Sequence, residues 1–356
     1  MKTIVSIVGI RPDFIRMSEI FKKLDENFNH IIVHTGQHYD DELSKSFFED
    51  LNIREPDYIL ETGKNSTNHY EQLSYLSKEI VYLFKDNNIE PDIILFLGDS
   101  NSALASIPLF KEGYKIGHIE GGMRSYDRRM PEEVNRVCCD YVSDLVFVYT
   151  PIYKQRLVKE NKDKSQIFVV GNTITEIINS HMPEGESRTG KYIVADIHRN
   201  ENLEVEQYAN VLNYLNELGE CLNLTVKLVR FNRGLKLIED HDMLKDKNHI
   251  ELCGPYGFFD YLKLQFDAYG IVSDSGTAQE ECPLLGVPVA VPRKKTERPE
   301  SVEFGNSIMI GEDHLDARID ETIEFFKKYK ISKDRVRWLG KGDTSQQITD
   351  ILLEKL

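Results

Sequence analysis

Short apolar segments alternate with longer amphipathic segments along almost the whole chain, and this alternation constrains the fold more than any other feature. In the first half the short segments are of strand length. They are Thr3–Val8, Ile31–His34, Ile93–Leu97, Ile116–Ile119, Leu145–Tyr149 and Ile167–Val170. The helical patterns between them are Phe14–Leu24, Tyr70–Phe84 and Val134–Ser143. Strand–helix alternation of this kind predicts a parallel sheet with helices on both faces.

The alternation restarts after a stretch of different composition. Residues His181–Lys191 are rich in glycine, serine, proline and charge, which favours a linker. The later strand patterns are Tyr192–Ile197, Leu224–Val229, Ile250–Leu252, Ile271–Ser273, Val287–Val291 and Ile308–Ile310. A length of 356 residues also favours two domains over one. We therefore expect an α/β protein with two doubly wound domains facing across a cleft, residues 1–172 and 173–340. A last helical pattern within 341–356 could pack back on the first domain.

Charge and cysteine content exclude several classes of protein. The net charge of −15 argues against nucleic acid as the main partner, because phosphate backbones need a basic surface. No apolar run in the sequence approaches the length that spans a membrane. The five cysteines form no CxxC pair, so neither a disulfide framework nor a zinc site is indicated. We expect a cytoplasmic protein with neither nucleic acid nor membrane as a partner.

The densest polar stretch is His118–Arg136, which holds four acidic residues, four arginines, a histidine and a Gly-Gly pair. Glu120 follows a strand pattern, and Pro131 begins an amphipathic helix. The apolar stripe of this helix comprises Val134, Val137, Cys138, Tyr141 and Val142. We expect the stripe to face the core. At about 100° per residue, Glu132 and Arg136 then point away from the core, so Glu132 is free to face a cleft. The alternative is a solvent-exposed ion pair between Glu132 and Arg136.

Polar residues follow other predicted strands, at the carboxyl ends where open α/β sheets bind ligands. Arg11 lies at a helix start after the first strand, where a phosphate site and an ordinary surface arginine are equally good interpretations. Asp99 follows the third strand and either caps the next helix or joins Glu120 in a catalytic group. His198, beside Arg199, follows the first strand of the second half, which makes it a candidate for an acid or a phosphate contact, with a structural histidine as the alternative.

A second turn suited to phosphate lies in the second half. Residues Val272–Gly286 predict a strand, a tight turn and a short helix. The turn Ser275–Thr277 offers N–H and hydroxyl donors at the helix start, which suits a diphosphate. Glu280 or Glu281 could hold ribose hydroxyls, and Arg298 follows a later strand. The alternative for each piece is an ordinary capped helix start.

These motifs together resemble the non-hydrolysing UDP-N-acetylglucosamine 2-epimerases over nearly the whole chain. The most specific matches are Gly9–Met17, His118–Arg136 and Val272–Glu300. The resemblance implies two Rossmann-like domains in the glycosyltransferase-B arrangement. It implies epimerisation of UDP-GlcNAc at C2 to UDP-ManNAc, by anti elimination of UDP and re-addition through 2-acetamidoglucal. It implies no cofactor and no metal, and we expect a homodimer that serves surface polysaccharide synthesis.

The resemblance also implies roles for residues. The catalytic group would be Asp99, Glu120, Glu132 and His198. The substrate-binding group would be Arg11, Arg124, Arg136, Arg199, Phe258, Ser275, Gly276, Thr277, Glu281 and Arg298. Within it, Arg11 and the turn Ser275–Thr277 would bind the diphosphate, Glu281 the ribose and Phe258 the uracil.

The chain departs from the family pattern at several positions. Ile10 and Arg16 replace a threonine and a lysine, and Arg230 replaces a histidine. Thr277 replaces a glycine and could narrow the diphosphate turn. The segment Tyr39–Leu43 lacks the glutamine-rich sequence of the enzymes that UDP-GlcNAc activates allosterically, so we do not expect that regulation.

The motifs conflict over the substrate. Arg124–Met130 resembles the UDP-GlcNAc enzymes and keeps that substrate first. Gln37–Asp40 and Tyr256–Tyr261 look more like a sister branch that epimerises other UDP-2-acetamido sugars, including 6-deoxy-L-hexoses and 2,3-diacetamido uronates. Further alternatives are a hydrolysing epimerase that releases UDP, a retaining glycosyltransferase and a sugar-nucleotide-binding protein without activity. The three carboxylates disfavour the last alternative.

Overall fold

The computed structural model describes residues 1–37 and 45–356, so the expectations for His38–Asp40 and Tyr39–Leu43 lie outside the described residues. The chain divides into two compact units. The first is Met1–Ile177 with Trp338–Leu356, and the second is Ile178–Arg337. Within the described ranges, no helix is long and apolar enough to cross a membrane.

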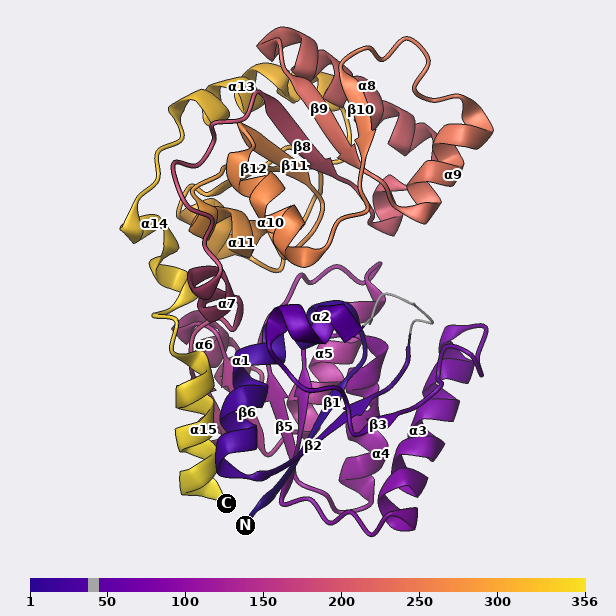
Figure 1. The fold of residues 1–356 in the computed structure, drawn as a ribbon, viewed down its shortest axis with the longest axis vertical. Coiled ribbons are helices and arrows are strands. Elements are labelled where there is room, and N and C mark those ends of the chain that lie inside the picture. The colour runs from indigo at the N-terminus through magenta and orange to yellow at the C-terminus, as the bar shows by residue number, and fades with distance from the viewer. Residues whose placement is uncertain (38–44) are drawn as a thin grey trace. The chain divides into compact units, whose positions relative to one another are not determined.

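The described residues of the first unit form a seven-stranded parallel sheet (Figure 1). Its strands are β1 (Thr3–Val8), β2 (Asn29–His34), β3 (Tyr58–Ile59), β4 (Ile93–Leu97), β5 (Ile116–Ile119), β6 (Leu145–Val148) and β7 (Ile167–Val169). Their order is β3-β2-β1-β4-β5-β6-β7, so the strand order reverses between β1 and β4. The loops that follow β1, β4 and β5 therefore meet at one edge, at the switch point where such sheets bind ligands.

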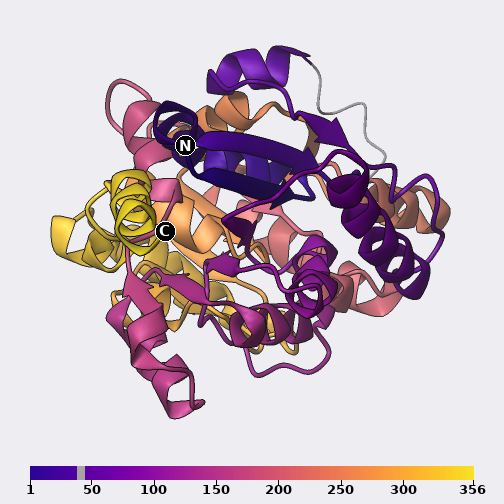
Figure 2. The same ribbon diagram turned by 90° about the horizontal axis from the view of Figure 1, so that it is seen from below.

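The central strands have continuous apolar sequences because helices cover both faces of the sheet. All residues of β4 and β5 are buried. The helices of this unit are α1 (Arg11–Asn27), α2 (Lys45–Leu51), α3 (His69–Asp86), α4 (Ser106–Lys111), α5 (Pro131–Val142), α6 (Pro151–Lys159), α7 (Ile174–Ser180) and α15 (Thr344–Lys355). The C-terminal helix α15 packs against α1 with Ile348 and Leu352 buried (Figures 1 and 2).

The second unit repeats the plan with a six-stranded parallel sheet in the described residues. Its strands are β8 (Tyr192–Asp196), β9 (Thr225–Val229), β10 (Ile250–Cys253), β11 (Gly270–Ser273), β12 (Val289–Val291) and β13 (Ser307–Met309). The order β10-β9-β8-β11-β12-β13 places the loops after β8 and β11 side by side. Its helices are α8 (Val205–Leu222), α9 (Asn232–His241), α10 (Phe258–Asp267), α11 (Ala278–Leu285), α12 (Pro299–Glu303), α13 (Ile319–Lys328) and α14 (Lys333–Val336). The predicted fold class, two doubly wound α/β domains, is confirmed.

The stretch His181–Lys191 is not a linker between the units, and that prediction was wrong. The boundary falls inside α7, and the stretch belongs to the second unit. The guanidinium of Arg188 donates to the carbonyls of Phe326 at 2.6 Å and Tyr269 at 2.8 Å. The glycine and serine content of His181–Lys191 predicted a flexible linker. Instead, Arg188 satisfies backbone carbonyls of the second unit that need hydrogen-bond donors, and this fixes the stretch to that unit.

Candidate active site

The first unit brings two of the expected carboxylates to one edge of its sheet. Asp99 follows β4 and Glu120 follows β5, and these strands are neighbours. Gly98 has a φ of +66° and Glu120 a φ of +73°, so both loops turn through left-handed backbone. A Cβ placed on Gly98 would lie 3.6 Å from Oε1 of Glu120. The two loops are therefore in close approach, and a residue other than glycine at 98 would be strained.

The Glu120 carboxylate is held by side chains from two other elements. Arg16 of α1 donates from Nη1 to Glu120 Oε2 at 2.7 Å. The Tyr149 hydroxyl, just after β6, donates to the same oxygen at 2.9 Å and lies 2.9 Å from the Thr173 hydroxyl. Glu120 is buried and keeps a positive φ, a backbone conformation that L residues adopt where surrounding contacts impose it. Its carboxylate is thus fixed in position.

Arg136 of α5 plays the corresponding part for Asp99. Its Nη2 pairs with Asp99 Oδ2, and its Nη1 donates to Glu133 Oε2 at 3.3 Å. The neighbouring Asn135 donates from Nδ2 to the Asp99 carbonyl at 2.9 Å. The Asp99 side chain remains 29% exposed, so it is anchored but open to a ligand.

Helix α5 buries the face opposite to the one predicted. Val134, Val137 and Tyr141 of the apolar stripe are 58%, 39% and 72% exposed. The buried residues of the helix are Glu133, Asn135, Arg136, Cys139 and Asp140. The prediction that the stripe faces the core was wrong, because most of the inward polar residues have specific partners inside the unit. Glu133, for example, accepts from the backbone N–H of Tyr126 at 2.9 Å.

Glu132 lies half-buried at the start of α5. Within the described residues it makes no hydrogen bond or ion pair, and the expected alternative, a pair with Arg136, is not formed. Glu132 therefore differs from Asp99 and Glu120, which are both held by arginines.

A buried histidine–aspartate pair lies beneath these loops. His118 of β5 contacts Asp140 of α5 through Nδ1 at 2.7 Å and the Gly98 carbonyl through Nε2 at 2.8 Å. A carbonyl and a carboxylate both accept, so both ring nitrogens carry protons. Burial lowers the pKa of His118, but the neighbouring Cys139 and Asp140 outweigh burial and raise it well above 6.5. Sequence reasoning missed this pair, whose only signal was an imidazole inside an otherwise apolar strand.

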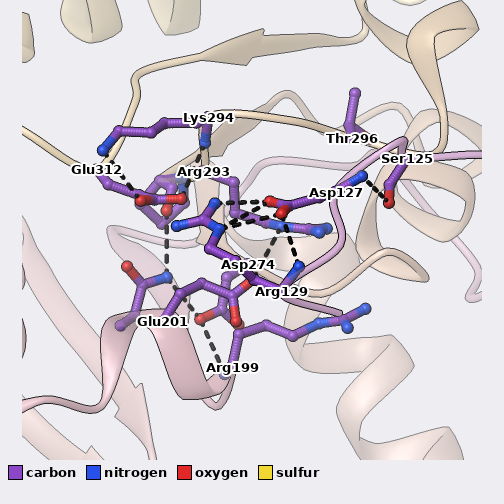
Figure 3. A network of polar contacts seen from close by, with 12 residues as sticks. Ser125, Asp127, Arg129, Arg199, Glu201, Asp274, Arg293, Lys294, Thr296 and Glu312 are labelled. Atoms are coloured by element: carbon purple, nitrogen blue, oxygen red, sulfur yellow. Dashed lines mark hydrogen bonds and ion pairs between the residues drawn. The ribbon is translucent and has the colours of Figure 1, made fainter. Parts of the chain in front are cut away.

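Arg124 joins this buried pair instead of the carboxylate edge. Its Nη1 donates to Asp140 Oδ2 at 2.7 Å and its Nη2 to Glu160 Oε2 at 2.6 Å. The structure thus engages Arg124 in the interior and does not bring it to Asp99 or Glu120. The loop that follows it is fixed by its own polar groups: Asp127 accepts from Arg129 Nη2 at 2.6 Å (Figure 3).

The turn at Arg11 is already occupied by a carboxylate. Asp13 Oδ2 accepts from the backbone N–H of Gly9 at 2.8 Å and of Ile10 at 3.2 Å. Burial, together with the charges of Asp99 and Glu120, outweighs the two backbone hydrogen bonds and raises the pKa of Asp13 to about 7. Two backbone N–H groups that were expected to bind a phosphate therefore donate to Asp13 instead. Arg11 is the cation of this turn, and its guanidinium lies 5.0 Å from the centre of the Phe47 ring.

In the second unit, His198 and Arg199 follow β8, and Asp274 follows the neighbouring β11. Asp274 is fully buried and accepts from the backbone N–H of His198 at 3.1 Å. It also accepts from the backbone N–H of Arg199 at 3.0 Å (Figure 3). It also accepts from Asn202 Nδ2 at 2.9 Å. Asp274 therefore fixes the backbone that carries the two expected site residues.

The turn after β11 brings together four residues of the expected binding group. The hydroxyls of Ser275 and Thr277 lie 2.9 Å apart. A Cβ placed on Gly276 would lie 2.2 Å from Nη1 of Arg298, so the guanidinium packs directly on this glycine. Arg298 is itself held by Glu280 at 2.9 Å. Only glycine fits at 276, because any side chain there would displace the arginine.

The remaining expected residues are placed as follows. Arg199 Nη2 lies 3.5 Å from Glu297 Oε1, which also accepts from Arg298 at 2.7 Å, so the turns after β8 and β11 are linked. Glu281 is buried in α11, and Gln265 Nε2 donates to it at 3.4 Å. Phe258 begins α10 with its ring centre 5.2 Å from that of Phe259. No group of three or more metal-binding side chains occurs among the residues that the structure describes.

Comparison with known proteins agrees with this architecture. The family model described as UDP-N-acetylglucosamine 2-epimerase matches residues 22–353. The UDP-N-acetylglucosamine 2-epimerase of Methanocaldococcus jannaschii is 34% identical over 97% of both chains. The UDP-2,3-diacetamido-2,3-dideoxy-D-glucuronate 2-epimerase of Pseudomonas aeruginosa is 31% identical, over 98% of this chain and 99% of that protein.

Solved structures give the same result. The M. jannaschii UDP-GlcNAc 2-epimerase in complex with UDP-GlcNAc and UDP matches with a TM-score of 0.89 at 32% identity, over 99% of this chain and 100% of that one. The Neisseria meningitidis enzyme bound to UDP-GlcNAc matches with a TM-score of 0.87 at 26% identity, over 100% of both chains. The family model and the similarity over the full length of these proteins show that the chain belongs to the UDP-N-acetylglucosamine 2-epimerase family.

Proposed function

We propose that this chain epimerises C2 of UDP-N-acetylglucosamine to give UDP-N-acetylmannosamine without net hydrolysis. The observation that carries the proposal is the pair of carboxylates, Asp99 and Glu120, at the switch point of the first sheet. Arginines hold both of them in place. Relatives with UDP-GlcNAc bound support the substrate.

In the proposed reaction a carboxylate takes the C2 proton, and the electron pair of the C2–H bond forms the C1=C2 double bond. UDP leaves with the electron pair of the C1–O bond, which gives 2-acetamidoglucal. UDP then adds back at C1 while a proton is delivered to the opposite face of C2. Proton transfer at two faces needs more than one group, and we propose Asp99, Glu120 and Glu132 for it. His198 would assist the reaction without carrying the C2 proton.

We assign the binding of UDP to cations and hydrogen-bond donors at the strand ends. Arg11, Arg199, Arg298 and the turn Ser275–Thr277 would hold the diphosphate, whose charge grows as the C1–O bond breaks. Arg136 would act through its pair with Asp99. Glu281 would hold the ribose and Phe258 the uracil. Arg124, buried against Asp140 and Glu160, would act on the positions of the loops and not on the substrate.

A second candidate substrate is another UDP-2-acetamido sugar, in particular a 2,3-diacetamido uronate. The full-length similarity to a UDP-2,3-diacetamido-2,3-dideoxy-D-glucuronate 2-epimerase favours it as the runner-up. The same C2 chemistry would apply, so the two candidates differ only in the groups at C3 and C6.

Proton NMR of the purified protein in D2O with each UDP-sugar tests both candidates. We expect UDP-GlcNAc to give UDP-ManNAc with deuterium at C2 and without stoichiometric free UDP. Turnover of only the diacetamido uronate would replace the first candidate by the second. Stoichiometric UDP release would establish a hydrolysing enzyme, and no turnover of any sugar would contradict the proposed function.

We also propose that the protein is a homodimer whose contact includes the exposed stripe of α5. Val134, Val137 and Tyr141 present apolar surface there, and these positions carry no charge. A twofold contact would place the stripe against its own copy, which avoids charge repulsion in a chain with a net charge of −15.

We expect Tyr141→Arg to convert the dimer into a monomer, because it would bury two like charges across the twofold axis. Light scattering after size-exclusion chromatography measures the mass. Leu353→Arg on α15, where Leu353 is 55% exposed, is the matched control and should stay dimeric. A wild-type mass of one chain, or a dimeric Tyr141→Arg variant, would contradict this contact.

We further propose a cytoplasmic protein that supplies surface polysaccharide synthesis. All five cysteines are free, which suits a reducing compartment. The proposed product, a nucleotide-activated amino sugar, is the form in which glycosyltransferases consume sugars. Deletion of the coding sequence should therefore remove N-acetylmannosamine from the cell-surface polysaccharide.

A further inference from the structure

The ring of His198 in the second unit lies between two carboxylates. Its Nδ1 is 2.8 Å from Asp196 Oδ1 and 3.6 Å from Asp274 Oδ1. A carboxylate can only accept, so Nδ1 carries a proton. Asp274 is committed to backbone groups of the same loop, which leaves Asp196 as the direct partner of the ring.

Asp196 is the last residue of β8, and both of its oxygens are used. Oδ1 faces His198, and Oδ2 accepts from the Tyr261 hydroxyl of α10 at 3.0 Å. Burial would raise the pKa of Asp196, but the charge of His198 and hydrogen bonds from His198, Tyr261 and Ser273 lower it. Asp196 therefore stays an anion although it is buried.

The other ring nitrogen of His198 is uncommitted. Within the described residues Nε2 has no hydrogen-bond partner, and the side chain is 32% exposed. Phe231, before α9, lies against the ring with the ring centres 5.0 Å apart. The charged groups around the ring are Asp196, Asp274 and Arg199. Burial and Arg199 lower the pKa of His198, and the two carboxylates outweigh them and raise it above 6.5.

We propose that Asp196 is a positioning residue that keeps His198 as an imidazolium and aims its Nε2–H at an anionic oxygen of the nucleoside diphosphate. The inference rests on the proposed function. As the C1–O bond breaks, its electron pair passes to the diphosphate oxygen, and His198 donates a hydrogen bond to that group. His198 keeps its proton throughout, and the C2 proton goes to a carboxylate. A charged donor that is already fixed in place stabilises such a charge more than a neutral one.

The rival interpretation is that Asp196 merely braces Tyr261 and β8. The positioning and bracing roles predict different effects on the pKa of His198 when the negative charge of Asp196 is removed. Asp196→Asn keeps the shape of the side chain but removes the anion, so the pKa of His198 should fall. Tyr261→Phe removes a brace but leaves the anion, so His198 should remain charged.

The first test is an NMR titration of the His198 ring in the free protein, with His198→Asn to assign the signal. We expect the wild-type ring to titrate above 6.5, Asp196→Asn to titrate at lower pH, and Tyr261→Phe to resemble the wild type. The readout needs no turnover, so it stands even where the proposed epimerisation fails. An unchanged titration in Asp196→Asn would overturn the inference.

The second test measures UDP affinity by calorimetry and kcat for UDP-GlcNAc against pH. We expect Asp196→Asn to lose about 100-fold in kcat at pH 8, as for loss of one donor to a developing charge. The loss should be smaller at pH 6, where the ring protonates without help, and UDP affinity should follow the same pH dependence. An equal loss at every pH, with a lower melting temperature and the same effect in Tyr261→Phe, would establish the bracing role instead.

Discussion

Glu120→Gln should lower kcat by roughly 10³-fold, in the range expected for loss of a group that transfers a proton. Glutamine keeps the length of the side chain, and Arg16 and Tyr149 can still donate to its carbonyl oxygen. What it loses is the ability to take or give a proton at C2. The effect should fall on kcat more than on KM, because the change removes a group needed in the transition state.

Exchange of the C2 proton for deuterium, measured with conversion by NMR, separates this effect from a binding defect. Both should fall together in Glu120→Gln, while UDP binding by calorimetry stays close to the wild type. Glu112→Gln is the matched control, since Glu112 lies on the surface paired with Lys85 at 2.8 Å. Retention of more than a third of wild-type exchange in Glu120→Gln would remove Glu120 from the proton-transfer group.

The place of each candidate site residue at a strand end could be predicted from the sequence. Asp99 and Glu120 follow strands of the first sheet and His198 follows a strand of the second, and within each parallel sheet the carboxyl ends share one edge. That rule needs only parallel strands, which the strand–helix alternation predicts. The same rule would have found Tyr149, which follows β6 and donates to Glu120, had it been applied to every strand.

The inward face of α5 was not predictable, because hydrophobic periodicity reports where apolar residues lie and not what the interior requires. The interior beside α5 holds a charged imidazole, a guanidinium and open backbone amides, all of which need acidic partners. Those partners come from Glu133 and Asp140. These pairs join residues 7, 16 and 22 positions apart, which is beyond the three- and four-residue spacing that helical periodicity reports.

Arg124 shows the same limit. Its place in a matching motif favoured substrate contact, yet its guanidinium is engaged by Asp140 and Glu160. A residue of a family motif can belong to the buried network that supports a site and need not contact the substrate itself. The stretch His118–Arg136 therefore carries both Glu120, at the carboxylate edge, and Arg124, in the buried network.

Asp140→Asn should lower the free energy of unfolding of the first unit by about 3 kcal/mol or more, since it removes one partner of a buried ion pair. Asp140 accepts from His118 at 2.7 Å, from Arg124 at 2.7 Å and from the Gly122 N–H at 3.1 Å. The substitution leaves the buried Arg124 without its buried counter-ion, so only the partly exposed Glu160 remains beside it. Urea unfolding followed by the fluorescence of Trp338, the sole tryptophan, reports on this unit.

Glu160→Gln is the matched control, because Glu160 contacts the same arginine at 2.6 Å but is 37% exposed. It should cost less than about 1 kcal/mol, as partly exposed pairs do. Equal losses in the two variants would contradict a special role for Asp140.

The pH dependence of the difference between the wild type and Asp140→Asn follows from the two pKa shifts. Burial would raise the pKa of Asp140, but His118 and Arg124 outweigh burial and lower it from 3.8. The stabilisation that Asp140 gives the folded state is therefore present above pH 3.8 and is lost as the pH falls through the lowered pKa. The pKa of His118 is raised in the folded protein, so the stabilisation that the charged His118 gives is complete below pH 6.5 and is lost as the pH rises through this raised pKa. The difference should therefore be largest between about pH 4 and 6.5. His118 also donates to the Gly98 carbonyl, next to Asp99. The loop that carries Asp99 should therefore be held most firmly in the same pH range in which the His118–Asp140 pair is strongest.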